Sequence, residues 1–184
     1  MEEHVGQWWH RFVTKLADTG FPQATVTLEE MEKRIGMMFR AAGGDHTVRV
    51  ASASLSKNSG TRAWLQRVAG VNQRVALPTL DPQALSLPSE IAVFEEIEFN
   101  KDLYLWLSAM AAVYEDTGDW IADNRAASAR VLQYFPGIRT KHEHLVRAHL
   151  AQRPLIKNLK AQEAIYESAI QSALRGDDHV PVFL

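Results

Sequence analysis

The stretch FNKDLYLWLSAMAAVY, at residues 99–114, decides the fold predicted for this chain. Apolar side chains between Leu103 and Val113 cover nearly every helical angle, and such a helix must be surrounded by other elements or by a partner. Asn100 is a favourable N-cap residue, and Asp102 suits the positive end of the helix dipole. The run is only about half of the ~20 residues needed to cross a bilayer. We therefore predict a helix at the centre of the core.

The composition is that of a folded globular protein. The chain has 184 residues, of which 46% are hydrophobic and 23% charged, so one domain or a small pair can bury a core. Cysteine is absent, which excludes disulfides, thiolate nucleophiles and cysteine-ligated metals and favours a reducing cytoplasm. The first residues are acidic and lead into an amphipathic segment rather than a secretory signal. We expect a cytoplasmic location and no contact with a membrane.

The net charge of −2 conceals blocks of opposite sign. Residues 46–80 contain five basic side chains and no acid, whereas residues 81–123 contain ten acids and one base. The balance becomes basic again after residue 123. Such blocks either pair across the fold or present a charged face to a partner. We favour internal pairing and solvation over the partner explanation.

Helical periodicity and capping signals predict a mainly α (α+β) fold. Thr27 and Glu30 match a capping box, and Gly43-Gly44 ends the same apolar segment by adopting a left-handed conformation. Asp119 is expected to cap another helix, and Pro154 to start the longest one. The expected helices span residues 4–18, 28–42, 100–117, 119–134, 138–152 and 155–175.

Residues 46–98 carry the β signal of the chain. Short, weakly alternating runs are separated by prolines there, which predicts a small antiparallel β insertion. The segment from Arg62 to Val68 is equally compatible with a helix. Residues 1–176 are expected to form one domain, followed by a linker or tail at residues 177–184.

Two groups of residues could carry chemistry, and we favour a structural explanation for both. His142, His144 and His149 share one predicted helix, but their spacings of two, five and seven differ from the i, i+4 spacing of a zinc pair. Packing or surface histidines are the favoured interpretation. Three acids at positions 95, 96 and 98 are better explained as a solvated acidic segment than as paired catalytic carboxylates. The chain also lacks a glycine-rich phosphate loop followed by Lys-Ser/Thr.

Two aromatic groups suggest binding rather than catalysis. The run from Arg62 to Arg67 interleaves basic and aromatic residues as nucleic-acid readers do, but the acidic overall balance argues against nucleic acid. Trp8 and Trp9 lie on one apolar stripe, where they either pack in the core or anchor an interface. The residues thus favour a binding or scaffolding module over an enzyme, with no catalytic residue, no metal ligand and no cofactor.

Four segments of the sequence resemble the N-terminal region of the CbbO/NorD family. They are VGQWWHRF at residues 5–12, the segment 26–44 ending in RIGMMFRAAGG, WLQRVAG at residues 64–70, and NKDLYLWL at residues 100–107. Members of this family are large adaptors that work with a hexameric MoxR-type AAA+ ATPase. A von Willebrand factor A domain at their C-terminal end recognises the client through a metal-ion site. This chain contains neither that domain nor its Asp-x-Ser-x-Ser motif, and so looks like a fragment of a longer protein.

The resemblance implies a non-catalytic adaptor domain that docks or links the ATPase to the client-binding domain. The segment at residues 5–12 is closer to the CbbO branch of the family. This resemblance implies Rubisco as the indirect client. The alternatives are the NorD branch, which supports nitric oxide reductase activation, and a stand-alone protein- or nucleic-acid-binding module. Docking to the ATPase needs exposed aromatic or arginine anchors, and Trp8, Arg11 and Lys15 are the candidates at the margin of the first apolar stripe.

Overall fold

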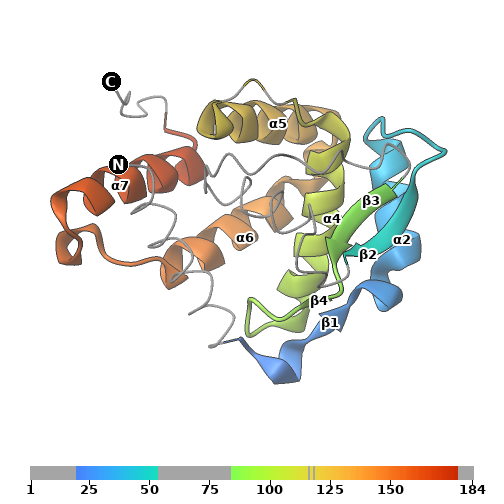
Figure 1. Ribbon diagram of the computed structural model, residues 1–184, viewed down its shortest axis with the longest axis horizontal. Coiled ribbons are helices and arrows are strands. Elements are labelled where there is room, and N and C mark those ends of the chain that lie inside the picture. Colours follow the sequence, from blue (N-terminus) through green and yellow to red (C-terminus); the bar gives the residue numbers. More distant parts are fainter. Residues whose placement is uncertain (1–19, 54–83, 116, 118, 178–184) are drawn as a thin grey trace.

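The computed structural model describes residues 20–53, 84–115, 117 and 119–177, and most of these are helical (Figure 1). The predicted mainly α fold with a small β part is confirmed. The elements in chain order are the 3-10 turn η1 (Pro22–Ala24), β1 (Val26–Thr27), α2 (Leu28–Ala41), β2 (Arg49–Ala53), β3 (Ala84–Pro88), β4 (Glu90–Ile91), α4 (Ile97–Val113), α5 (Trp120–Tyr134), η2 (Pro136–Ile138), α6 (Arg139–Gln152), η3 (Ile156–Asn158) and α7 (Ala161–Arg175). The expected helix at residues 4–18 lies outside the described residues.

The boundaries of α2 follow from local capping, as predicted. The Glu30 side chain accepts from the Thr27 backbone N–H at 2.9 Å, and the Thr27 hydroxyl accepts from the Glu30 N–H at 3.3 Å. At the other end Gly43 adopts a left-handed φ of 96°, and the Gly44 N–H donates to the Phe39 carbonyl at 2.9 Å. Both ends therefore have partners for backbone groups that a helix leaves unpaired.

The strands pair differently from the antiparallel insertion that was expected. β1 and β4 are antiparallel, but β2 and β3 are parallel, with Arg49 opposite Ala84 and Ala53 opposite Pro88. Parallel strands need a long crossover between them, and residues 54–83 join β2 to β3. The antiparallel prediction rested on short runs separated by prolines, and such runs do not determine the direction in which strands pair.

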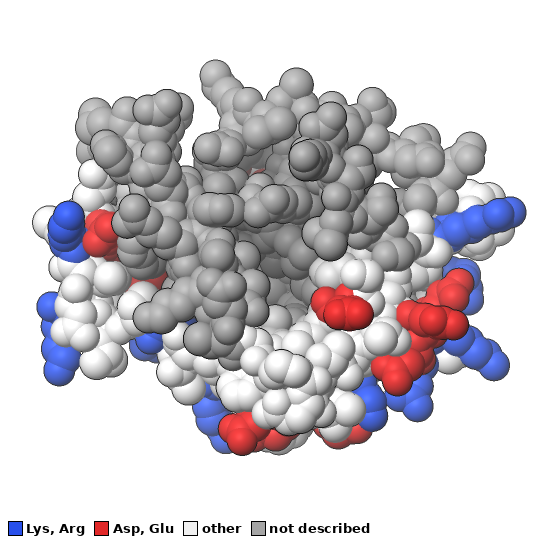
Figure 2. Space-filling model, turned by 60° about the horizontal axis from the view of Figure 1, so that its bottom comes forward, with Lys and Arg blue, Asp and Glu red and all other residues white. Residues whose placement is uncertain are grey.

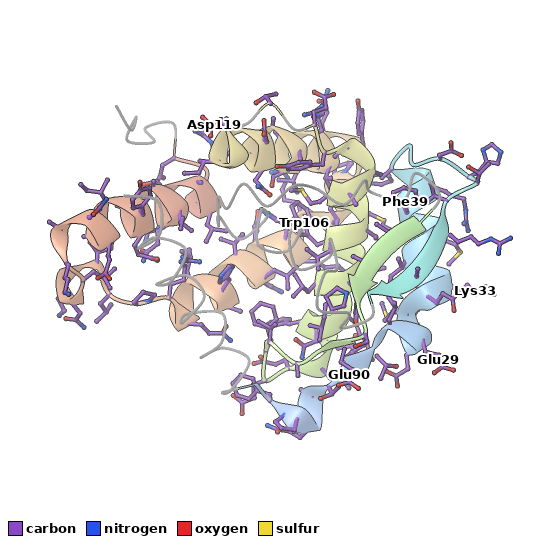
Figure 3. All side chains as sticks on the ribbon, in the orientation of Figure 1. Glu29, Lys33, Phe39, Glu90, Trp106 and Asp119 are labelled. Atoms are coloured by element: carbon purple, nitrogen blue, oxygen red, sulfur yellow. The ribbon has the colours of Figure 1, made fainter. Side chains whose placement is uncertain are left out.

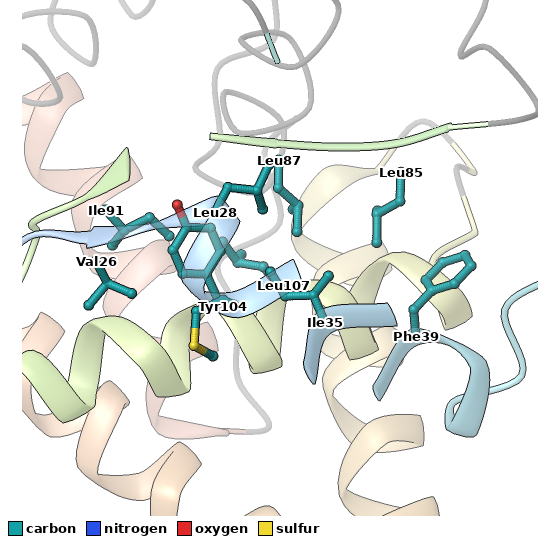
Figure 4. Packing of buried hydrophobic residues seen from close by; sticks show 10 residues of the cluster. Val26, Leu28, Ile35, Phe39, Leu85, Leu87, Ile91, Tyr104 and Leu107 are labelled. Carbon is teal, nitrogen blue, oxygen red and sulfur yellow. The ribbon is translucent and has the colours of Figure 1, made fainter. Parts of the chain in front are cut away.

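The predicted central helix is confirmed as α4, which packs against α2, α5 and α6 (Figure 1). One apolar cluster joins α4 to α2 and the strands, and Figure 4 shows its packing. Its buried members are Val26, Leu28, Met31, Ile35, Phe39, Leu85, Leu87, Ile91, Tyr104 and Leu107. A second cluster joins α4 to α5 through Ala42, Ala109, Met110, Ala127 and Val131. Burying each large aliphatic side chain contributes roughly 2 kcal/mol, so these contacts hold the scaffold together.

α4 begins at Ile97, with Glu96 as its N-cap residue, and Asn100 is not the cap that was predicted. The Asn100 side chain is completely buried and bonds four backbone groups. Its Oδ1 accepts from the N–H groups of Val93 and Phe94 at 3.0 and 2.9 Å. Its Nδ2 donates to the carbonyls of Ala24 and Phe94 at 2.9 and 2.8 Å. Asn100 thus ties η1 and the segment before α4 to the central helix.

α4 also ends earlier than the predicted residue 117. Tyr114 has an extended backbone, with φ −72° and ψ 132°. The buried Asp123 carboxylate accepts from the Thr117 N–H at 3.0 Å and from its hydroxyl at 2.6 Å. These side-chain bonds satisfy Thr117 outside a helix. Asp119 caps α5 as predicted, accepting from the Ile121 and Ala122 N–H groups at 3.1 Å.

The last helix begins at Ala161 rather than at residue 155, so Pro154 does not start the longest helix. α4, with 17 residues, is longer than α7, with 15. The Glu163 side chain accepts from the Lys160 N–H at 3.2 Å, and this contact fixes the later start. Among the described residues, no helix has the length and apolarity required to cross a membrane.

Candidate functional site

Two of the three histidines of α6 serve helix packing. The His142 ring lies 4.1 Å from the Trp106 ring, centroid to centroid, and the His144 ring lies 6.1 Å from that of Phe99. His149 places its Nε2 atom 3.2 Å from Nη1 of Arg153. No group of three His, Cys, Asp or Glu residues that could hold a metal is present in the described part of the chain. His142 and His149 thus contact other side chains, and His144 lies at an exposed position.

Burial controls the charge of two of these rings. It lowers the pKa of His142, and it lowers the pKa of His149 to about 4, with the nearby Arg153 guanidinium acting in the same direction. His149 is therefore neutral at pH 7, and its Nε2 accepts a hydrogen bond from Arg153.

A buried ion pair joins α6 to α7. The Arg153 and Glu167 side chains are both 0% exposed, and two bonds of 2.6 and 2.8 Å connect the guanidinium to the carboxylate. The Gln171 side chain donates to the same carboxylate at 2.8 Å and to the Pro154 carbonyl at 3.2 Å. Every charged group in this α6–α7 ion pair has a partner, so its role is structural.

The sequence analysis did not predict this ion pair. The structure buries Glu167, Ala169 and Gln171, while Ile165 is 50% exposed. The one available signal was the i, i+4 spacing of Glu167 and Gln171 after Arg153, because polar residues at that spacing meet on one helix face.

Part of the acidic block at residues 81–123 forms ion pairs with basic residues that follow residue 123, as the internal-pairing interpretation predicted. Lys141 of the second basic block contacts Asp102 of the acidic block at 2.5 Å, and Arg130 contacts Glu115 at 2.6 Å. The acids at positions 95, 96 and 98 are exposed, and Glu98 pairs with Lys101 at 2.5 Å. The predicted solvated acidic loop is correct in its exposure, but Glu98 lies in the first turn of α4 rather than in a loop.

A surface groove runs between α2 and the strands, and we call it the α2–β2 groove. It consists of two adjoining hollows of about 510 and about 390 Å³ that share Glu29, Glu32 and Val50. The larger is lined by Glu29, Glu32, Lys33, Gly36, Arg40, His46, Val48, Arg49 and Val50, and the smaller continues to Thr27, Leu28, Ser89 and Glu90.

Charges are separated along this groove. The acids Glu29, Glu32 and Glu90 lie at the end where α2 begins, and Arg40 and Arg49 lie at the end where α2 finishes. The basic Lys33 lines the groove between these ends. Figure 3 shows Glu29 beside Glu90, with Lys33 further along α2. In the space-filling view, acidic and basic side chains gather at the edge of the molecule that α2 forms (Figure 2). None of these five side chains forms an ion pair with another described residue.

The docking residues predicted from the sequence, Trp8, Arg11 and Lys15, lie outside the described residues. The basic and aromatic run at residues 62–67 lies outside them as well. These two hypotheses therefore stay predictions. The α2–β2 groove is the site that the described part of the chain offers, and the sequence analysis did not single it out.

Comparisons with known proteins relate the whole chain to one group. It is 40% identical over 183 residues to the protein named NorD of Stutzerimonas stutzeri, a match that covers 100% of this chain and 30% of that protein. It is 31% identical over 194 residues to NorD of Brucella abortus, covering 98% of this chain and 30% of that protein. An uncharacterized protein of Pseudomonas aeruginosa is 38% identical over 174 residues, with 95% of this chain and 28% of that protein covered.

The chain thus spans less than a third of the length of the curated relatives it matches. No model of a protein family and no solved structure matches it. The relatives with a name are called NorD, so the comparisons support the NorD branch that was the alternative in the sequence analysis. They give no support to the predicted CbbO branch, which rested on the segment at residues 5–12 alone.

Proposed function

We propose that this chain is a non-catalytic part of a NorD-type accessory protein that supports the activation of nitric oxide reductase. The observation that carries the proposal is the similarity of the entire chain to proteins named NorD, at 40% and 31% identity. Rubisco activation, the function of the CbbO branch, has no comparable support.

The described architecture supports an adaptor role. The buried side chains of Arg153 and Glu167 bond each other and hold α6 to α7, and His142 and His149 of α6 contact aromatic or charged side chains. Five charged side chains along the α2–β2 groove, Glu29, Glu32, Glu90, Arg40 and Arg49, form no ion pair with another described residue. A rigid helical scaffold with charges at its surface suits protein binding.

The proposed partner is a hexameric MoxR-type AAA+ ATPase, which would supply the hydrolysis. Nitric oxide reductase would be the client, recognised by a part of the accessory protein that this chain does not contain. Trp8, Arg11 and Lys15 are the proposed docking residues, and neither a nucleic acid nor a membrane is a partner in this proposal.

A genetic test addresses the function directly. A denitrifying strain lacking the full-length accessory gene is complemented with that gene, either intact or with this segment deleted. We expect the intact gene to restore nitric oxide consumption and the deleted form to leave it low while reductase protein levels stay equal. Full restoration by the deleted form would overturn the proposal, provided that immunoblots show both forms at equal abundance.

A binding test addresses the partner. The ATPase encoded beside the gene should co-elute with the intact chain in size-exclusion chromatography. Trp8→Ala together with Arg11→Ala should weaken that complex about thirtyfold, because a few aromatic and arginine anchors dominate most interfaces. If the double variant melts like the parent and still co-elutes, these residues are not the docking anchors.

A further inference from the structure

The α2–β2 groove combines three properties that neither the fold nor the proposed function uses. The first is an open strand edge. Among the described residues β2 pairs with β3 on one side only, and Val48, Arg49 and Val50 of the β2 region line the groove opposite α2. An open edge presents backbone N–H and C=O groups that an extended segment can pair with.

The second property is the missing side chain at Gly36. Glycine in the interior of a helix costs about 1 kcal/mol relative to alanine. The backbone at Gly36 is ordinary α-helix, and a Cβ there would meet only the guanidinium of Arg40, with 3.3 Å to the nearest atom. Because the tip of an arginine can move aside, the fold does not require glycine at this position. Gly36 is buried, and its missing side chain lets the Arg40 guanidinium lie against the helix in the wall of the groove.

The third property is the charge at the two ends. The acids Glu29 and Glu32 and the base Arg40 lie on the same flank of α2, since residues at these spacings share a side of a helix. From Glu29 to Arg40 the helix rises about 16 Å at 1.5 Å per residue. An extended chain advances about 3.3 Å per residue, so roughly five residues bridge the two ends.

We propose that the α2–β2 groove binds an extended segment of a partner protein that adds to the free edge of β2. This segment carries a basic side chain at the end near Glu29, Glu32 and Glu90 and an acidic side chain at the end near Arg40 and Arg49. Small apolar side chains lie between them, over Val50. Backbone pairing with β2 supplies the affinity, and the two charged ends fix the register.

The proposal goes beyond the adaptor function and does not depend on it. To test it, random heptapeptides displayed on phage are selected on the full chain, and the enriched peptides are measured with a fluorescent label by anisotropy at low salt. We expect peptides with a basic residue near one end and an acidic residue near the other. Hydrogen exchange should show slower exchange at the β2 amides when such a peptide binds.

Three variants make the test specific. Glu29→Lys with Glu32→Lys should weaken binding at least tenfold, whereas the matched change Glu95→Lys with Glu143→Lys, at exposed positions away from the groove, should change it less than twofold. Gly36→Leu should abolish binding by filling the groove. A circular-dichroism melt of each variant separates lost binding from lost folding. If Gly36→Leu does not fold, the charge variants alone test whether the groove binds the peptide.

Three outcomes would overturn the proposal. One is a selection that yields no binder, or binders without charges of opposite sign at their ends. Another is that the selected peptides bind the Glu29→Lys, Glu32→Lys variant as tightly as the Glu95→Lys, Glu143→Lys control, or that hydrogen exchange at the β2 amides does not change when they bind. The third is self-association of the chain that Gly36→Leu abolishes, which would assign the groove to a second copy instead of a partner segment.

Discussion

The two regions that flank the central helix handle charge in opposite ways. On the α6–α7 side, Arg153 and Glu167 are fully buried and bonded to each other. On the α2–β2 side, Glu29, Glu32 and Arg40 are exposed, and none of them forms an ion pair with another described residue. The two regions are connected through α4, because α2 and α6 both pack against it.

The free-energy cost of desolvating a charge explains the difference between the buried and the exposed charges. Removing a charge from water costs several kcal/mol, and only a closely bonded partner offsets that cost. A paired and buried charge is therefore committed to the fold. An exposed charge keeps its hydration and contributes little to stability, so it is available to a partner. The α6–α7 ion pair therefore serves the fold, and the exposed charges of the α2–β2 groove are those on which the binding proposal rests.

The largest effect should come from breaking the buried pair. Arg153→Ala leaves the Glu167 carboxylate buried without its guanidinium, and we expect it to lower the free energy of unfolding by about 3–5 kcal/mol. Urea denaturation followed by circular dichroism measures this loss. Arg153→Met combined with Glu167→Leu removes both charges at similar volume and should recover most of it. A double variant as unstable as the single one would mean that the pair is not the cause.

A buried neutral group sharpens the comparison. Asn100→Ala deprives two N–H groups and two carbonyls of their partner, and each unsatisfied buried group costs about 1–3 kcal/mol. We expect a loss of about 3 kcal/mol, since water can enter and satisfy some of these groups. Lys101→Ala, at the next position, removes an exposed ion pair with Glu98 and should cost well under 1 kcal/mol.

Acidification should weaken the α6–α7 side selectively. The pKa of His149 is lowered to about 4 in the folded protein from about 6.5 in the unfolded chain. Stability from the neutral ring is therefore complete above pH 6.5 and is lost as the pH falls from 6.5 towards 4. At about 1.4 kcal/mol per pKa unit, the loss approaches 3 kcal/mol near pH 4.

Denaturation curves from pH 7 to 4 check this prediction. His149→Gln removes the titrating group and should flatten the pH dependence. Burial also lowers the pKa of His142, so a His142→Gln variant identifies the part of the slope that comes from that ring. A slope that His149→Gln leaves unchanged would contradict the assignment.

The smallest effect is a gain on the binding side. Gly36→Ala should raise the free energy of unfolding by up to about 1 kcal/mol, because alanine is the better helix former and the new Cβ meets only the end of Arg40. Gly44→Ala is the contrasting variant, since its Cβ would lie 2.3 Å from the Phe39 ring and should destabilise the protein. A loss of stability in Gly36→Ala would show that the fold needs this glycine.

Local signals predicted the parts of the fold that depend on neighbouring residues. The capping box of Thr27 and Glu30, the left-handed Gly43 and the cap at Asp119 all act within one helical turn, and each is where the sequence placed it. The apolar character of α4 needs no partner sequence to be recognised, because a helix without a polar side has to be enclosed.

Features that depend on distant residues could not be predicted in this way. The parallel pairing of β2 with β3 depends on how residues 54–83 cross between them, and the burial of Glu167 depends on Arg153 of another helix. Asn100 matched a helix cap locally, yet its contact with Ala24 comes from a segment 76 residues earlier. The α2–β2 groove exists only once β2 lies beside α2, so its residues have no signature in either segment alone.

The same substitution on both sides tests the comparison most directly. Glu29→Gln with Glu32→Gln changes two groove acids, and Glu167→Gln changes one acid of the buried pair. In urea denaturation at pH 7, we expect the groove variant to lose less than about 1 kcal/mol and the Glu167 variant to lose about 3–5 kcal/mol. Equal losses would contradict the account, because they would show that the groove acids stabilise the fold as the buried pair does.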